Sequence, residues 1–273
     1  MILTETNPVG IGTWRMGMRR DEATQEVVAD PSNDAQHLEA LRYSLSLGQN
    51  HIDTAELYGQ GHTEQLVGEA IKGFERSKLF VASKLWLTHY QRGQVVPAVK
   101  GMLERLDISY LDLLYAHTPE TEVPMAEYLA GMNEAVEAGL VRSLGVSNFN
   151  LEQLREAMDL SKAPIVALQN RYNVTYREKL PQDLLDFCHK NSVTVVAYRP
   201  VERGSVGENP VLAEIAQEHG ATAAQVALSW LIQQEGVVAI PKASSKAHIE
   251  ENLGALNLTL NQSDLARLED AQG

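Results

Sequence analysis

Cysteine is almost absent from the sequence, which has one, Cys188, in 273 residues. A single cysteine cannot form an internal disulfide, so we expect a reducing compartment and a thiol buried in a helix. Long apolar runs are also absent, and none approaches the ~20 residues that span a bilayer. The first ten residues carry no basic segment followed by an apolar one, which is the pattern of a secretory signal. The sequence therefore predicts a cytoplasmic protein with no membrane contact.

Basic residues are outnumbered, with 23 lysines and arginines against 36 aspartates and glutamates and a net charge of −13. An acidic surface disfavours nucleic acids and anionic membranes as partners. The eight histidines include no H-x-x-x-H pair and no grouping with metal-ligand spacing, so we expect no metal site. The stretch "GIGTWRMG" lacks the glycine spacing of the Rossmann fingerprint, so a Rossmann domain is not predicted either.

What the chain does contain is an alternation of short apolar runs with amphipathic segments. The apolar runs cover residues 7–14, 49–55, 79–86, 111–117, 142–148, 163–170, 193–200 and 237–244. Helical patterns cover residues 34–48, 63–74, 95–107, 125–139, 150–160, 179–192, 222–236 and 261–271. Strands that are apolar on both faces and alternate with helices form parallel sheets covered by helices. Eight such units without a linker predict a single-domain (β/α)8 TIM barrel over residues 1–273.

Capping residues support several helix boundaries, because Asp34, Asn150 and Thr222 stand where helical patterns begin. Two connections, residues 15–33 and 202–209, are long. Both follow predicted strands, so both would rim the mouth of the barrel, where active sites of this fold lie. For the first connection, a partial cover over the site and a solvated loop are equally open.

Every predicted strand delivers a polar or aromatic group at its carboxyl end. In chain order these groups are Thr13 and Trp14, Asp53 with Tyr58 in its loop, Lys84 and Trp86, His117, Ser147 and Asn148, Gln169 and Asn170, Tyr198 and Arg199, and Lys242, Ser244 and Ser245. Each alone is weak evidence, since such residues are more commonly caps, core histidines or surface charges. As a set they predict a site at the mouth of the barrel.

Four of these residues form a plausible chemical unit. Lys84 would be embedded in a strand, where an unpaired ammonium is costly, so it needs an acid, and Asp53 on the neighbouring strand is the natural partner. The ammonium would also lower the pKa of Tyr58, ordinarily ~10, toward the working range. His117 could hydrogen-bond a substrate oxygen from the other side. Together they would transfer a proton to a carbonyl oxygen, while another group transfers the hydride.

The stretch "PKASSKAHIEEN" gathers positive charge in an otherwise acidic chain. Lys242, Lys246 and His248 surround Ser244 and Ser245 at the start of a predicted helix. A helix start with such neighbours can bind phosphate groups. A plain capped helix with solvated lysines is the other interpretation.

At this point the motifs resemble those of the aldo-keto reductase superfamily, in the family's order and over nearly the whole chain. The similar stretches are "GIGTW", "IDTAELYG", "SKLW", "LYAHTP", "GVSNF" and "IPKASSKAHIEEN". The resemblance implies a (β/α)8 barrel that binds NADPH in extended form without a Rossmann domain. It also implies reduction of aldehydes and ketones to alcohols.

The resemblance implies roles for individual residues. Tyr58 would be the general acid, Lys84 and Asp53 would tune it, and His117 would orient the carbonyl. Trp14 and Trp86 would flank the substrate together with Tyr58 and His117. The implied cofactor-binding residues are Gly12, Thr13, Trp14, Asp53, Ser147, Asn148, Gln169, Tyr198, Arg199, Pro200, Val201, Ile240, Lys242, Ala243, Ser244, His248, Glu251 and Asn252.

Two positions depart from the family pattern. "YRPV" stands where the family often has "YSPL", which places Arg199 near the pyrophosphate or in solvent. His248 occupies a position that is commonly arginine in members preferring NADPH. Arginine would clamp a 2′-phosphate as a permanent fork, whereas histidine is mostly neutral at pH 7. Because Lys242 is present, we expect NADPH as the preferred cofactor and NADH as an alternative one.

The resemblance thus predicts an NADPH-dependent reductase of small carbonyl compounds, acting as a monomer or weak homodimer. A short loop after His117 and the lack of a long tail after the last helix predict an open site with broad selectivity. Two other functions stay open. One is a non-catalytic or slow nucleotide-binding subunit that senses redox state, and the other is a lyase in which Lys84 forms a Schiff base.

Overall fold

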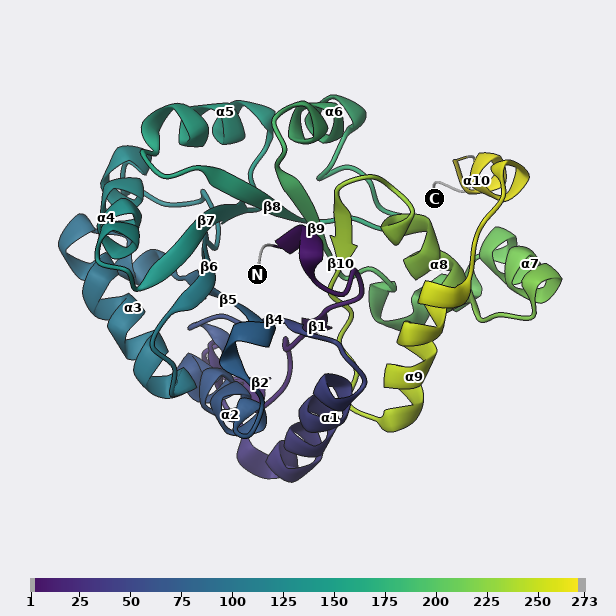
Figure 1. The fold of residues 1–273 in the computed structure, drawn as a ribbon, viewed down its shortest axis with the longest axis horizontal. Coiled ribbons are helices and arrows are strands. Elements are labelled where there is room, and N and C mark those ends of the chain that lie inside the picture. The colour runs from purple at the N-terminus through teal and green to yellow at the C-terminus, as the bar shows by residue number, and fades with distance from the viewer. Residues whose placement is uncertain (1–2, 270–273) are drawn as a thin grey trace.

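Eight short parallel strands form one sheet in the order β1-β4-β5-β6-β7-β8-β9-β10 (Figure 1). The computed structural model describes residues 3–269. The strands are β1 (Ile11–Gly12), β4 (His51–Asp53), β5 (Phe80–Leu85), β6 (Leu111–Ala116), β7 (Val141–Ser147), β8 (Ile165–Arg171), β9 (Thr194–Tyr198) and β10 (Val237–Ala239). Each strand falls on one of the eight apolar runs, although β7 begins one residue before its run and β8 ends one residue after its run. The eight predicted strands are therefore confirmed.

The first and last strands meet, so the sheet closes on itself. Val9 pairs with Ala239 in parallel. The Gly10 N–H donates to the Ala239 carbonyl at 2.8 Å, and the Gly12 N–H donates to the Pro241 carbonyl at 3.0 Å. Helices surround the sheet on the outside (Figure 1). The predicted (β/α)8 barrel is confirmed.

All eight predicted helical segments are present. They are α1 (Asp34–Ser46), α2 (His62–Ile71), α3 (Arg92–Leu106), α4 (Met125–Glu137), α5 (Leu151–Leu160), α6 (Gln182–Lys190), α8 (Ala223–Ile232) and α10 (Gln262–Glu269). The predicted helix start near Ser245 is also correct, because α9 spans Lys246–Gly254 with Ser245 as its N-cap. Cys188 is buried in α6 as expected, and burial raises the pKa of its thiol to about 12.

Two of the three predicted caps are correct. Asn150 and Thr222 each form a capping box with the glutamine three residues later. Asp34 is the first helical residue of α1 and does not cap it, since Asn33 holds the N-cap position without a side-chain hydrogen bond. The capping carboxylate is that of Asp30, which accepts from the Ser32 N–H at the start of a preceding 3-10 turn.

The helix α7 (Pro210–His219) was missed from the sequence. Its signals are local. Asn209 accepts hydrogen bonds from the N–H groups of Val211 and Leu212, and Pro210 occupies the first helical position. Gly220 ends the helix with φ +61°.

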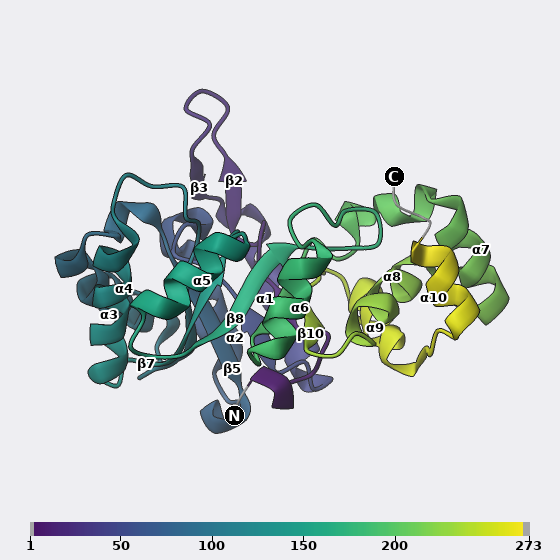
Figure 2. The same ribbon diagram turned by 90° about the horizontal axis from the view of Figure 1, so that it is seen from above.

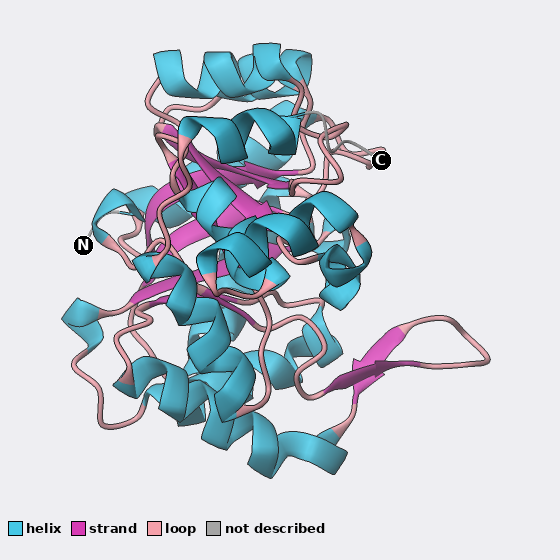
Figure 3. Ribbon diagram, turned by 90° about the vertical axis from the view of Figure 1, so that its right-hand side faces the viewer, coloured by secondary structure: helices cyan, strands magenta, loops and turns pink. Residues whose placement is uncertain are grey.

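The long connection at residues 15–33 is a β-hairpin rather than a loop. Its strands β2 (Met18–Arg20) and β3 (Val27–Ala29) pair antiparallel. The hairpin projects from the body of the barrel (Figures 2 and 3). Its base packs on the 3-10 turn η3 (Tyr58–Gly61): a Cβ atom on Gly59 would lie 2.8 Å from the Gly17 carbonyl oxygen. The hairpin therefore packs against the turn that carries Tyr58 and supports it.

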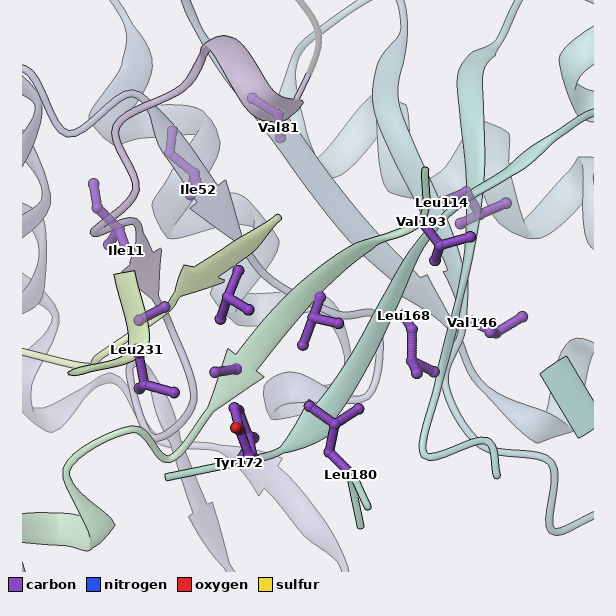
Figure 4. Close-up of a cluster of buried hydrophobic side chains, with 14 of the residues drawn as sticks. Ile11, Ile52, Val81, Leu114, Val146, Leu168, Tyr172, Leu180, Val193 and Leu231 are labelled. Carbon is purple, nitrogen blue, oxygen red and sulfur yellow. The ribbon is translucent and has the colours of Figure 1, made fainter. Parts of the chain in front are cut away.

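Side chains on both faces of the sheet are buried, which explains why the strands lack a polar face. Val81, Leu114 and Leu168 point toward the helices in the larger core cluster (Figure 4). The inward side chains, among them Phe80, form a second cluster inside the barrel. Leu3 of the turn η1 (Leu3–Glu5) joins this inner cluster at the amino ends of the strands, so the opposite end is left for a site.

Closure of the barrel depends on the small size of Gly12. A Cβ atom there would lie 2.5 Å from the Ile240 carbonyl oxygen. We expect Gly12→Ala to lower the free energy of unfolding by about 1–3 kcal/mol, because the backbone must shift. Gly93→Ala is the control: Gly93 lies in α3 with open space around its Cα, and alanine there should not destabilise the helix. Urea unfolding of the two variants compares them, and equal stabilities would contradict the account.

Candidate active site

A buried ion pair lies at the carboxyl ends of β4 and β5. Asp53 of β4 pairs in register with Ala82 of β5, so Lys84, two residues on, points to the same inner face. The Lys84 ammonium forms an ion pair with the Asp53 carboxylate, and it donates to the Thr54 carbonyl at 2.9 Å. Lys84 is 1% exposed and Asp53 is 2% exposed. The predicted pairing of these residues is present.

Tyr58 reaches the same ammonium from the turn η3. Its hydroxyl lies 3.3 Å from the Lys84 Nζ, and the side chain is buried. The turn is tight because Gly59, Gln60 and Gly61 all adopt positive φ, at 58°, 53° and 93°. This backbone folds the chain back at once, so the phenol faces the strand end that precedes it.

The local electrostatics keep the Lys84 ammonium and the Tyr58 hydroxyl protonated. Burial alone would lower the pKa of Lys84, but the charges of Asp53 and Tyr58 outweigh it and hold that pKa above its ordinary value. Burial raises the pKa of Tyr58, and this outweighs the lowering by Lys84. The sequence-based expectation of a lowered Tyr58 pKa was therefore wrong, because desolvation of the phenolate dominates. A phenol that stays protonated at neutral pH is suited to donate a proton.

His117 lies on the other side of Tyr58. Their ring centroids are 5.9 Å apart, and the Trp86 ring lies 5.0 Å from His117. Burial, and then the charge of Lys84, hold the pKa of His117 well below its usual value, so the imidazole is neutral. Its Nδ1 is buried and finds no hydrogen-bond partner within residues 3–269. We infer that the ring proton sits on Nε2, since a buried N–H without an acceptor is rarely tolerated.

Amide side chains connect the strand ends around Asp53, Lys84, Tyr58 and His117. Gln169 donates from Nε2 to the second Asp53 carboxylate oxygen at 2.7 Å, so both oxygens of that carboxylate are engaged. Asn148, at φ +66°, donates from Nδ2 to the His117 carbonyl at 3.0 Å. The Tyr198 hydroxyl donates to the Asn148 Oδ1 at 2.8 Å. These bonds link β8 to β4, and β6 and β9 to β7. The Asn148 N–H, which donates to the Gln169 carbonyl at 3.0 Å, joins the two groups into one frame of five strand ends.

A cavity of about 970 Å³ opens beside this frame. The sequence-predicted residues that line it are Gly12, Thr13, Trp14, Asp53, Tyr58, Trp86, His117, Ser147, Asn148, Gln169, Tyr198, Arg199, Pro200, Val201, Ile240, Lys242, His248, Glu251 and Asn252. Lys84 lies beneath the lining, in contact with Tyr58. The cavity is large enough for an extended dinucleotide together with a small substrate.

Two predicted cofactor residues are not brought to the cavity surface. Ala243 packs with Ala40 and Ile249 in a small apolar cluster. Ser244 lies at the edge and accepts a hydrogen bond from the Lys242 Nζ at 2.9 Å, so it orients that lysine instead of lining the cavity.

Sequence reasoning missed several lining residues. They are Arg15, Leu57, Leu87, Thr118, Glu120, Lys179, Gly204, Val206, Gly207, Thr222, Ala223 and Ala224. The segment η6 (Glu202–Glu208) was expected at the mouth, and its three lining residues fit that expectation. Residues 16–33 do not contribute to the lining. The hairpin therefore stands beside the mouth and does not cover it.

Part of the cavity lining is cationic. Arg15 and Lys242 both line it, and the pKa of Lys242 is lowered by burial and then by the charge of Arg15. Arg199 and His248 also line the cavity. In a chain of net charge −13, two neighbouring cations on the lining of a cavity mark a place for an anionic group.

Residues 3–269 hold no cluster of three or more histidine, cysteine, aspartate or glutamate side chains that could bind a metal ion. Over the same residues, each helix is too short or too polar to cross a membrane.

Comparison with known proteins gives the same class of protein as the fold and the site. The aldo/keto reductase family model matches residues 8–272. Methylglyoxal reductase YeaE of Escherichia coli is 35% identical over 269 residues, covering 96% of this chain and 90% of that protein. Methylglyoxal reductase DkgB of Yersinia pestis is 32% identical over 270 residues, covering 94% of this chain and 90% of that protein. The chain belongs to the aldo/keto reductase family, whose members are NAD(P)H-dependent oxidoreductases acting on carbonyl groups.

Solved structures agree with this assignment. A thermostable aldo-keto reductase in complex with the inhibitor epalrestat has a TM-score of 0.90 and 42% identity, covering 97% of this chain and 95% of that one. An aldo/keto reductase from Klebsiella pneumoniae, in complex with NADP and acetate, has a TM-score of 0.86 and 31% identity, covering 97% and 91%.

The buried pair is testable as a unit. Asp53→Asn leaves an ammonium without a carboxylate, and Lys84→Met leaves a carboxylate without an ammonium. We expect each single variant to lose about 3–5 kcal/mol of unfolding free energy, and the double variant to lose much less than the sum. Urea denaturation of all four proteins gives the coupling energy. Additive losses would show that the two charges do not depend on each other.

Proposed function

We propose that the protein reduces aldehydes and ketones to alcohols, with NADPH as the preferred hydride donor and Tyr58 as the proton donor. The observation that carries the proposal is the buried contact between Tyr58 and the Lys84–Asp53 pair at the floor of the cavity. Two relatives with about a third of their residues identical are named methylglyoxal reductases, which supports small carbonyl substrates.

The residues of the chain account for the proton half of the reaction. When bound, the nicotinamide supplies the hydride to the carbonyl carbon. As negative charge develops on the carbonyl oxygen, the Tyr58 hydroxyl donates its proton to that oxygen. The Lys84 ammonium stabilises the phenolate that remains, and Asp53 keeps the ammonium in place. The neutral His117, with its proton on Nε2, orients the carbonyl by a hydrogen bond.

The cavity lining offers groups that suit different parts of the cofactor. Ser147, Asn148 and Gln169 provide hydroxyl and amide groups beside Tyr58, which fits a nicotinamide carboxamide. Arg15 and Lys242 provide positive charge on the same lining, which fits phosphate groups. Related structures in complex with NADP or NADPH support this choice of cofactor.

The proton donor can be removed with little change in shape. We expect Tyr58→Phe to lower kcat for aldehyde reduction by about 10²–10⁴-fold, because the phenol proton is lost. NADPH binding, followed by its fluorescence, should be retained. Turnover is measured as NADPH oxidation with methylglyoxal, aromatic aldehydes, ketones and 2-oxo acids. A variant with near-normal turnover would remove Tyr58 from this role.

The preference for NADPH depends on charge near the adenosine phosphate. We expect His248→Arg to raise the ratio of kcat/KM for NADPH over NADH by about tenfold, because a guanidinium binds phosphate through two hydrogen bonds. Lys246→Arg is the matched control on the same helix, since the Lys246 Nζ pairs with Glu39 outside the cavity. Wild-type kcat/KM values that favour NADH would contradict the proposed preference. Equal effects of the two substitutions would show that position 248 does not contact the phosphate.

We also propose that the protein acts in the cytoplasm as a monomer or weak homodimer. The single buried thiol of Cys188 and the acidic charge support a reducing aqueous compartment. Sedimentation equilibrium determines the oligomeric state, and cell fractionation determines the compartment.

A further inference from the structure

We propose that Glu56 is a positioning residue. It holds Trp86 in place as part of the cavity wall, and it thereby sets the affinity for substrates with a large apolar group. This inference deepens the proposed carbonyl reduction and rests on it. Glu56 stands in the loop between Asp53 and Tyr58, where the proposed mechanism gives it no role. It is only 8% exposed, and a glutamate is rarely so buried unless its carboxylate has specific partners.

The Glu56 carboxylate bridges two loops at the mouth of the barrel. One oxygen accepts a hydrogen bond from the Trp86 backbone N–H, and the other lies 3.1 Å from the His89 Nδ1. The Glu56 N–H in turn donates to the Lys84 carbonyl at 3.3 Å. The loop that carries Tyr58 is thus tied to the turn η5 (Leu87–His89) that follows β5.

The turn depends on this carboxylate for its anchoring. Trp86 is the residue at the N-cap position of η5, and no side chain of the turn itself caps it. Burial raises the pKa of Glu56, and the Trp86 N–H and His89 offset part of that effect. Glu64 from α2 is the other charged group near it, and it repels the carboxylate. A carboxylate held at such a cost is best explained by the geometry that it imposes.

That geometry reaches the reacting groups through Trp86. The Trp86 ring packs edge-on against His117 at 5.0 Å, and His117 in turn packs against Tyr58. Trp86 and Leu87 both line the cavity. A short aliphatic carbonyl compound contacts only Tyr58 and His117, whereas the ring of an aromatic aldehyde also packs against the cavity wall formed by Trp86 and Leu87. Loosening the turn should therefore weaken binding of the larger substrate and leave the chemical step intact.

The test compares two substrates, methylglyoxal and 4-nitrobenzaldehyde, in wild type and in Glu56→Ala, at saturating NADPH. We expect KM for 4-nitrobenzaldehyde to rise about 5- to 20-fold in the variant, with kcat within about threefold. KM for methylglyoxal should change less than about twofold. Equal KM increases for both substrates, or a fall in kcat with KM unchanged, would overturn the inference.

Further variants separate positioning from general stability. Glu56→Gln keeps an acceptor for the Trp86 N–H and should restore most of the affinity. Glu56→Asp is one methylene too short to reach the turn, and it should reproduce the KM effect if Glu56→Ala fails to fold. Glu64→Gln is the matched control, because its buried carboxylate bonds to Ser83 and Arg105 instead of the turn. We expect that control to lower the Tm without changing either KM.

A double-mutant cycle locates the effect in Trp86. In a Trp86→Leu background, Glu56→Ala should raise KM for 4-nitrobenzaldehyde by less than about twofold, since the wall is already lost. Independent, multiplicative effects would show that Glu56 acts elsewhere.

A readout without turnover separates this inference from the proposed function. In a Trp14→Phe, Trp230→Phe background Trp86 is the one remaining tryptophan and can be excited selectively. Glu56→Ala should make its fluorescence more accessible to acrylamide quenching. If wild type reduces neither aldehyde, the proposed function fails, and quenching still decides whether Glu56 fixes Trp86. Unchanged quenching would overturn the inference even in an active enzyme.

Discussion

The cost of burying an ammonium is the constraint on which the rest of the site depends. Lys84 is almost completely buried, and such a charge is tolerated only beside an opposite charge with further hydrogen bonds. Asp53 supplies the charge, and the second carboxylate oxygen is held by Gln169. The pair forms only if β4 and β5 are neighbours in the observed register, so the fold and the site require each other.

The lining of the cavity offers two environments with different chemistry. Around Tyr58 the environment is buried and the phenol and imidazole are neutral, which suits transfer of a proton to an oxygen that becomes charged. Around Lys242 and Arg15 the surface is cationic, which suits phosphate groups. A protein of net charge −13 thus presents a local positive field where an anionic cofactor would enter.

The sequence predicts most of this fold because strand and helix periodicities are strong in long segments. The hairpin was missed because its strands are mostly solvent-facing, with Val27 the one buried residue among their six, so they carry no buried apolar run. The pairing of Lys84 with Asp53 was predictable from the cost of an unpaired charge. The direction of the Tyr58 pKa shift was not, because it depends on how completely the phenol is buried. Lining residues such as Arg15 and Thr222 depend on which loops converge, and no local pattern marks them.

The pH dependence of kcat/KM for aldehyde reduction at saturating NADPH tests the central claim most directly. Because burial raises the pKa of Tyr58, the proton is present at neutral pH and is lost only as the pH rises past that pKa. The account therefore predicts a kcat/KM that does not fall between pH 6 and about 10, and that declines above the ordinary tyrosine value of ~10. A decline centred near ~6.5, the ordinary value for histidine, would assign the proton to His117 and contradict the account.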